Sequence, residues 1–129
     1  MPNVLIVDDN AKECGILRCL FDAQTDFVVC GEAENGFEAV EKARELSPDL
    51  IVLDLSRLLL GALEAAQALK LARPDVPLFM ITVDYTVATE REALSKGISA
   101  VFAKDDDLKN CLLPNARAIF QAAHEAAGD

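Results

Sequence analysis

Short runs of hydrophobic residues alternate along the chain with longer segments in which hydrophobic and polar residues are mixed. Each short run contains about four hydrophobic residues, often β-branched, and most of the runs end at a polar residue or a turn. Such runs are typical of strands that are buried on both faces of a sheet. The pattern predicts five strands, at residues 4–7, 27–30, 50–53, 78–81 and 100–103.

The segments between the runs have helical spacing. Hydrophobic residues recur every three or four positions, which predicts helices with one buried face. Ser47 and Pro48 stop the second of these helices, and Gly97 is a plausible C-cap of the fourth. The predicted helices are residues 11–23, 36–46, 62–72 and 87–96, followed by a last helix that carries Leu108, Cys111, Leu112, Ala116 and Ile119.

Strands that alternate with helices predict a parallel sheet covered on both faces, because each crossover must bury both of its elements. We therefore expect an α/β domain with a doubly wound five-stranded sheet. The length of 129 residues suits one such domain. In this class of fold, ligands bind beyond the carboxyl ends of the strands, so the polar residues at those ends are the candidates for function.

Five polar residues follow predicted strands: Asp8, Asp9, Asp54, Thr82 and Lys104. Three carboxylates at one edge of a sheet repel one another unless a cation is bound, and Mg²⁺ is the ion that best fits such a site. Asp54 could act as a nucleophile and form an aspartyl phosphate. The Thr82 hydroxyl and the Lys104 ammonium could then contact the oxygens of the phosphoryl group.

Four short sequence motifs lie in this order at the ends of predicted strands: LIVDDN, LIVLDL, MIT and VFAKD. The chain resembles the receiver domains of bacterial response regulators in these motifs and over nearly its whole length, from Val4 to about Phe120. It is most similar to receivers fused to a helix-turn-helix output domain. The resemblance implies a flavodoxin-like (βα)5 fold with strand order 2-1-3-4-5, and a receiver domain at residues 1–122 followed by a tail or linker at 123–129.

The resemblance also implies a chemistry. Asp54 is expected to accept a phosphoryl group from a histidine kinase, a phosphotransfer protein or a small phosphodonor. Asp8, Asp9, Asp54 and the backbone carbonyl of Ser56 are expected to hold Mg²⁺. Apart from its own phosphorylation and dephosphorylation, the domain is not expected to be an enzyme.

Switching is expected to follow phosphorylation. The resemblance implies that Thr82 moves toward the phosphoryl group and that Lys104 forms a salt bridge to it. The surface built by the fourth helix, the fifth strand and the fifth helix would then engage a downstream protein or a fused output domain, or a second copy of the chain.

Three features depart from the receiver pattern. Leu58–Leu60 stand where the family usually has a polar turn, and they could pack inward, extend the next helix or form a contact patch. Val83 stands where a smaller residue usually leaves access to the acceptor. Val101 replaces the usual switch aromatic, with Phe102 on the opposite strand face.

These departures keep other functions open. A degenerate receiver that binds proteins without phosphorylation is the main alternative. A Mg²⁺-dependent phosphatase with Asp54 as a transient nucleophile would want a second acid nearby, but Ser56 stands two residues on. A nucleotide-binding domain is weaker still, since no glycine-rich phosphate loop follows the first strand.

The composition limits the kinds of molecule that the domain is expected to bind. A formal net charge of -10 argues against direct binding of nucleic acid by this domain. No hydrophobic run is long enough to span a membrane and no signal peptide is recognised, so we expect a cytoplasmic protein. The cysteines have no metal-ligand spacing and are expected to be core thiols: Cys14, Cys19, Cys30 and Cys111.

Overall fold

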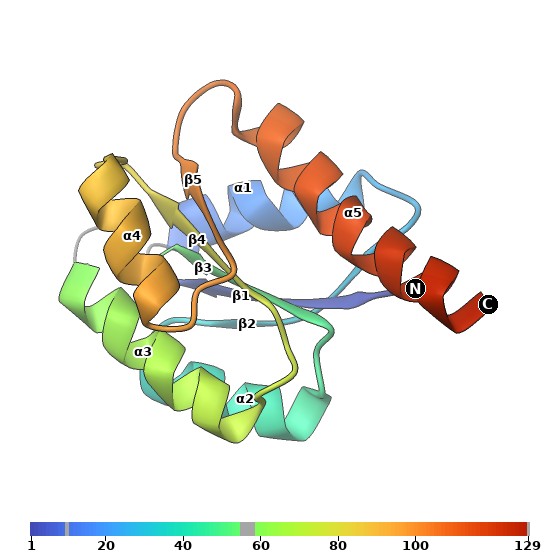
Figure 1. Cartoon of the computed structure of the whole chain (residues 1–129), viewed down its shortest axis with the longest axis horizontal. Coiled ribbons are helices and arrows are strands. Elements are labelled where there is room, and N and C mark those ends of the chain that lie inside the picture. Colours follow the sequence, from blue (N-terminus) through green and yellow to red (C-terminus); the bar gives the residue numbers. More distant parts are fainter. Residues whose placement is uncertain (10, 55–58, 129) are drawn as a thin grey trace.

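The structure is a computed structural model of the chain. It describes residues 1–9, 11–54 and 59–128, and within them the side chains outside 11–14, 59–60 and 122–128. Five parallel strands form one sheet in the order β2-β1-β3-β4-β5, which confirms the predicted topology (Figure 1). The strands are β1 (Asn3–Asp8), β2 (Val28–Ala33), β3 (Leu50–Asp54), β4 (Leu78–Thr82) and β5 (Ala100–Ala103).

The helices cover both faces of this sheet. Two of them, α1 and α5, lie on one face, and the other three lie on the opposite face (Figure 1). This is the doubly wound arrangement that the alternation of strands and helices predicts. The helices are α1 (Ala11–Asp22), α2 (Gly36–Leu46), α3 (Leu59–Ala72), α4 (Val87–Ser95) and α5 (Leu108–Gly128).

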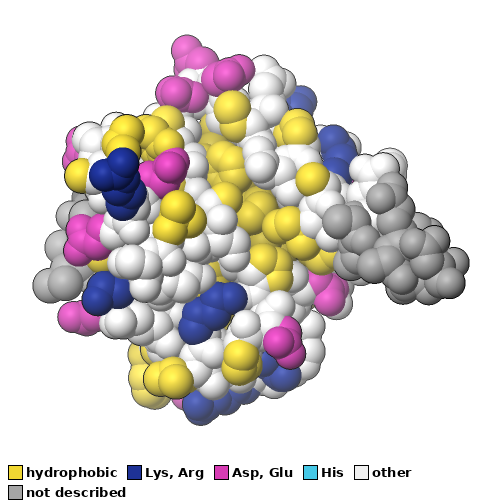
Figure 2. All heavy atoms as spheres, viewed as in Figure 1, with side chains coloured by type: hydrophobic (Ala, Val, Ile, Leu, Met, Phe, Trp, Pro, Cys, Tyr) yellow, Lys and Arg dark blue, Asp and Glu magenta, His cyan; other side chains and the backbone are white. Residues whose placement is uncertain are grey.

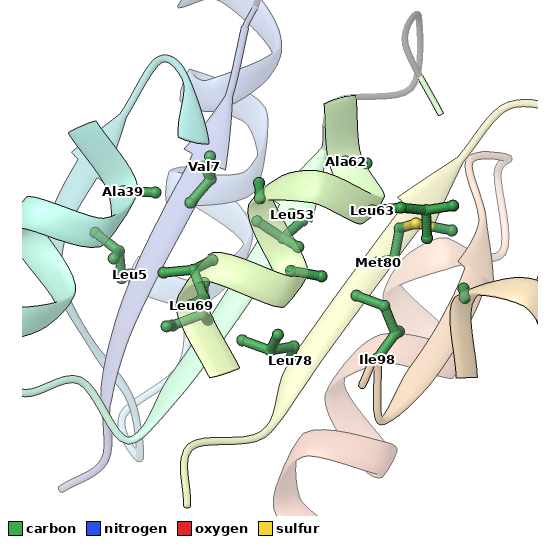
Figure 3. Close-up of a cluster of buried hydrophobic side chains, with 14 of the residues drawn as sticks. Leu5, Val7, Ala39, Leu53, Ala62, Leu63, Leu69, Leu78, Met80 and Ile98 are labelled. Carbon is green, nitrogen blue, oxygen red and sulfur yellow. The ribbon is translucent and has the colours of Figure 1, made fainter. Parts of the chain in front are cut away.

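Alternate residues of each strand enter two separate hydrophobic layers. In β1, Leu5 and Val7 face α2 and α3, whereas Val4 and Ile6 face α1 and α5. Figure 3 shows the first layer, in which strand side chains such as Leu53 lie against α3. Full burial of a side chain of this size contributes about 1.5–3 kcal/mol, so the sheet is held firmly from both sides.

The second layer is rich in aromatic rings. Phe79 of β4 and Phe102 of β5 lie side by side, with ring centroids 5.0 Å apart. Val101 belongs to the opposite layer, so Val101 and Phe102 point to different faces, as the sequence predicted. Both side chains are buried, which leaves no exposed aromatic residue on β5 itself.

Some elements extend further than expected. Helix α3 begins at Leu59 rather than residue 62, so Leu59 and Leu60 extend the helix; Leu58 lies outside the described residues. Leucine and alanine are strong helix formers, which is the physical reason for the longer helix. Helix α5 continues to Gly128, through residues for which a tail or linker was expected. The domain boundary at residue 122 stays a prediction.

Strand β2 also continues beyond its predicted end, to Ala33. Its pairing with β1 shifts by one residue at Gly31, where Leu5 pairs with Gly31 and Val4 with Val29. A Cβ atom at Gly31 would lie 2.7 Å from Leu46 Cδ1. Glycine at this position therefore leaves room for the Leu46 side chain, a requirement that a search for hydrophobic runs does not detect.

The helix ends follow local signals in the sequence. Asn35 caps α2 by accepting the backbone N–H of Glu38, and Ser47 ends that helix in a left-handed conformation. The C-cap of α4 is Lys96 rather than the predicted Gly97, which comes next with φ at +102°. These caps fix where the connections enter and leave the sheet.

Candidate functional site

The predicted polar residues gather at the carboxyl edge of the sheet. Asp8 and Asp54 are the last residues of β1 and β3, Thr82 is the last residue of β4, and Lys104 follows β5. We call these four residues, which include the predicted acceptor Asp54, the acceptor site. Asp8 and Asp54 are each 1% exposed and Thr82 is 5% exposed, although the middle of the sheet is otherwise lined by hydrophobic side chains.

Asp8 and Asp54 are direct partners in the pairing of β1 with β3. Both continue the alternation that faces α1 and α5, so the two carboxyl groups project from the same face of the sheet. Two buried carboxylates on one face disfavour each other's charge. This part of the predicted cluster is brought together by the fold.

Lys104 supplies one positive charge to the acceptor site. Its Nζ lies 2.6 Å from Asp54 Oδ2, so the two side chains form a salt bridge. The Asp54 side chain is 1% exposed and the Lys104 side chain is 21% exposed. The Lys104 backbone N–H donates to the carbonyl of Thr82 at 2.8 Å, which ties the ends of β4 and β5 together. The lysine is therefore anchored at both its backbone and its ammonium group.

The other oxygen of the Asp54 carboxylate is in a different environment. Asp54 Oδ1 is buried and has no hydrogen-bond partner among the described residues. A buried carboxylate oxygen without a partner is costly, and it is the kind of atom that a hard cation would coordinate. The carboxylate oxygens at this edge are thus of the type that Mg²⁺ prefers.

One residue of the predicted metal set differs in burial from Asp8 and Asp54, and another is not described. The side chain of Asp9 is exposed, since it follows Asp8 and falls on the other side of the alternation. Ser56 lies outside the described residues. Within the part of the chain that is described, no group of three or more His, Cys, Asp and Glu side chains is arranged to hold a metal ion.

Thr82 lies at the same edge but is hydrogen-bonded elsewhere. Its Oγ1 accepts the backbone N–H of Asp84 at 3.2 Å. Val83, between them, is 59% exposed and points outward rather than into the core. The hydroxyl group of Thr82 is engaged by the connection to α4, which we call the switch loop (residues 83–86).

The switch loop contains a residue that the sequence patterns did not single out. Tyr85 is 41% exposed, and its hydroxyl donates a hydrogen bond to Glu90 in the first turn of α4. This hydrogen bond raises the pKa of the Tyr85 phenol, because a phenolate would face the Glu90 carboxylate. Its position three residues after Thr82 was the available signal.

The cysteines were predicted less well. Cys19 and Cys111 are exposed rather than in the core, because they lie on the outer sides of α1 and α5. Cys30 is half-buried, and burial raises the pKa of its thiol. These three thiols are free; the side chain of Cys14, like that of His124, lies outside the described residues.

Comparison with known proteins identifies a family. A sequence model described as "Response regulator receiver domain" matches residues 4–112. A putative transcriptional regulator of Pseudomonas aeruginosa is 34% identical over 88% of this chain and 54% of its own length. A protein-glutamate methylesterase/protein-glutamine glutaminase of Paramagnetospirillum magneticum is 36% identical over 79% of this chain and 28% of its own length. The chain thus spans about half or less of these relatives.

Solved structures agree with the fold. The response regulator domain of Thermotoga maritima CheB has a TM-score of 0.78 and 30% identity, with 95% of this chain and 96% of that chain covered. The CheX–CheY complex of Borrelia burgdorferi with BeF3 and Mg²⁺ has a TM-score of 0.81 at 23% identity, covering 92% of this chain and 88% of the other.

Proposed function

The chain belongs to the response regulator receiver domain family of two-component signalling, and from this premise we propose that it is a phosphorylation switch with Asp54 as the phosphoryl acceptor. The family is not one of conventional enzymes. The observation that carries the proposal is the environment of Asp54. Its carboxylate is buried beside Asp8, Oδ2 is paired with Lys104 at 2.6 Å, and Oδ1 has no hydrogen-bond partner among the described residues.

This environment suits a nucleophile. In the transfer, a carboxylate oxygen of Asp54 forms a bond to phosphorus while the bond between phosphorus and the donor atom breaks. A phosphohistidine donor would keep the electron pair of that bond on its imidazole nitrogen, which then takes up a proton. The product is an aspartyl phosphate, with negative charge spread over three outer oxygens.

Lys104 would neutralise part of this charge. Its ammonium group already lies beside the acceptor carboxylate, so a small shift would carry it from Asp54 Oδ2 to an oxygen of the phosphoryl group. The Thr82 hydroxyl would donate to another oxygen, because it keeps a proton to donate while its oxygen accepts from Asp84.

A divalent cation would neutralise the remaining negative charge of the acceptor site. We propose that Asp8 and Asp54 contribute carboxylate oxygens to Mg²⁺, with Asp9 and the Ser56 carbonyl as further ligands. The bound ion would offset the repulsion between the carboxylates and the incoming phosphoryl oxygens. The CheY complex of Borrelia burgdorferi contains Mg²⁺ and BeF3, and we extend this ion to the present chain as part of the proposal.

We propose that phosphorylation at the acceptor site changes the surface formed by α4, β5 and α5. In the view of Figure 2, hydrophobic side chains gather in a band across the face between α4 and α5. Because the curated relatives are about twice this length or more, we propose that the chain acts on a downstream protein or on an output domain in the same polypeptide. The phosphoryl donor would be a histidine kinase or a phosphotransfer protein.

Intact-mass measurement tests the acceptor. The chain is incubated with Mg²⁺ and acetyl phosphate, and we expect one added phosphoryl group on the wild type and on the control Asp75→Asn, which changes an exposed carboxylate. Asp54→Asn should show no added mass. Equal labelling of Asp54→Asn and wild type would assign the acceptor elsewhere.

The same experiment distinguishes the proposed phosphorylation switch from the main alternative. A degenerate receiver that only binds proteins would remain unlabelled with every donor, although it would be folded. In that case, amide spectra with beryllofluoride and Mg²⁺ would also stay unchanged around Asp54, and the proposed function would be wrong.

A further inference from the structure

Tyr85 is tethered to α4 in the present structure. Its hydroxyl donates to the carboxylate of Glu90, one turn into the helix. The same turn is fixed by Thr86, whose side chain caps the backbone N–H of Thr89 and whose carbonyl accepts from Glu90 at 2.9 Å. The first turn of α4 thus holds the ring at the surface, where the side chain is 41% exposed.

Tyr85 is also connected to the acceptor site through the backbone. Asp84, the residue before it, donates its N–H to Thr82 Oγ1 at 3.2 Å. A hydroxyl oxygen can keep this hydrogen bond while its proton is donated to another group. If the Thr82 side chain turns toward Asp54, the N–H of Asp84 either follows Oγ1 or loses its acceptor, so this hydrogen bond couples the backbone before Tyr85 to the position of Thr82.

A pocket lies next to the ring. It has a volume of about 240 Å³. Its lining consists of Tyr85, three residues of β5, two acids of the connection to α5 and one residue of α5 itself: Val101, Phe102, Ala103, Asp105, Asp107 and Cys111. A cavity of about 150 Å³ is enough to hold a benzene molecule. Val101 occupies the place where a larger side chain would reduce this space, so the pocket has room for a phenol ring.

The walls of the pocket suit tyrosine in particular. Its inner wall is apolar, with Val101 and Phe102 both buried. Its outer wall includes Asp105 and Asp107, whose carboxylates can accept a hydrogen bond from a phenol hydroxyl. A tyrosine that left Glu90 could therefore bury its ring and still satisfy its hydroxyl group.

We propose that Tyr85 is a positioning residue that transmits the state of Asp54 to the surface of α4, β5 and α5. When Thr82 turns toward a phosphorylated Asp54, the Tyr85 ring leaves Glu90 and enters the pocket over Val101. The inference rests on the proposed function of Asp54. Strand β5 of this chain carries no exposed aromatic ring. The proposal therefore places the aromatic movement in the switch loop.

Nuclear magnetic resonance of valine methyl groups tests the movement. An aromatic ring that stacks over Val101 shifts its methyl resonances upfield, so we expect this shift when beryllofluoride and Mg²⁺ are added to the wild type. Tyr85→Leu should bind beryllofluoride but leave the Val101 methyl groups unshifted. Because Tyr85 is the single tyrosine and tryptophan is absent, tyrosine fluorescence reports on the same ring independently.

Variants that release the ring test the tether without any phosphoryl mimic. Glu90→Gln weakens the hydrogen bond, and Tyr85→Phe removes it while keeping the ring. Both should move the Val101 methyl resonances partly toward their beryllofluoride-bound positions. Arg91→Gln, one residue away and exposed, is the matched control and should leave them in place.

The outcomes distinguish the two proposals. If beryllofluoride changes the amide resonances of Asp54 and Thr82 but neither the Val101 methyl groups nor the tyrosine fluorescence, the role of Tyr85 is wrong and the acceptor assignment stands. If beryllofluoride changes none of these signals, both are wrong. If Tyr85→Phe and Glu90→Gln leave Val101 unshifted, the proposed tether is wrong.

Discussion

Asp8 and Asp54 are paired neighbours across β1 and β3, and each side chain is only 1% exposed. Hydrophobic residues in the same two strands stabilise the sheet, whereas these two acids reduce its stability because their charges are close and poorly solvated. Lys104 offsets part of this charge through its salt bridge to Asp54 Oδ2.

Asp8→Asn should stabilise the protein when divalent ions are absent. Removal of one of two adjacent negative charges is expected to raise the free energy of unfolding by about 1 kcal/mol, within the usual range of single substitutions. The wild type should gain thermal stability from Mg²⁺ and the variant should gain much less, as measured by thermal unfolding with Mg²⁺ or with EDTA. Asp75→Asn serves as the control, and an equal gain from Mg²⁺ in all three proteins would contradict a site at Asp8.

Lys104→Ala should lower stability, because it leaves the buried carboxylate of Asp54 without its charged partner. A loss of about 1–3 kcal/mol in the free energy of unfolding is expected for such a group. The double variant Asp54→Asn, Lys104→Ala should recover part of the loss, which urea denaturation can measure. No recovery would mean that the lysine stabilises the fold through its packing instead of its charge.

The same lysine variant tests switching. Lys104→Ala should still take up a phosphoryl group on Asp54, because the nucleophile is intact, but it should lose the conformational response. The measurement compares amide spectra of the phosphorylated variant and wild type, with intact mass as the check on labelling. A full spectral response in the variant would assign the coupling to Thr82 alone.

Gly97→Ala should destabilise the turn after α4. Gly97 has φ at +102°, and an added Cβ would lie 2.9 Å from Lys70 Cγ. Alanine in such a conformation costs about 1–2 kcal/mol. Gly15→Ala is a control that should instead stabilise the protein. Nothing lies within 4 Å of its added Cβ, and alanine is the better helix former by about 0.5–1 kcal/mol. Equal effects of the two substitutions would contradict this account.

The Tyr85 phenol should titrate above its ordinary pKa, because deprotonation would place a phenolate beside the Glu90 carboxylate. Glu90→Gln should bring the pKa of Tyr85 back toward its ordinary value. Since the folded-state pKa is raised, the stabilisation is complete below the ordinary phenol pKa and is lost as the pH rises through the raised value. Ultraviolet absorbance of the single tyrosine measures this directly, and unchanged titration in the variant would contradict the hydrogen bond.

The strands and the four residues of the acceptor site could be predicted because each depends on neighbours in the sequence. A run such as residues 50–53 must be buried, and the residue after it must emerge at the carboxyl edge. The pairing of Asp8 with Asp54 follows once β1 and β3 are adjacent. The strand order itself came from the resemblance to receivers, since hydrophobic periodicity says nothing about which strands are neighbours.

The features that were missed depend on contacts between distant residues. The pocket beside Tyr85 is formed with residues of β5 and the start of α5, and Gly31 lies against the side chain of Leu46. The exposure of Cys19 depends on which side of α1 faces the sheet. None of these can be read from a local pattern, because each is set by how the helices pack.

The irregular pairing at Gly31 has a consequence for how the protein behaves in concentrated solution. The sheet has two outer strands, and one of them, β5, is only four residues long. The other, β2, loses its regular register at the glycine. A short border strand and an irregular one are both features that disfavour edge-to-edge pairing with a second molecule.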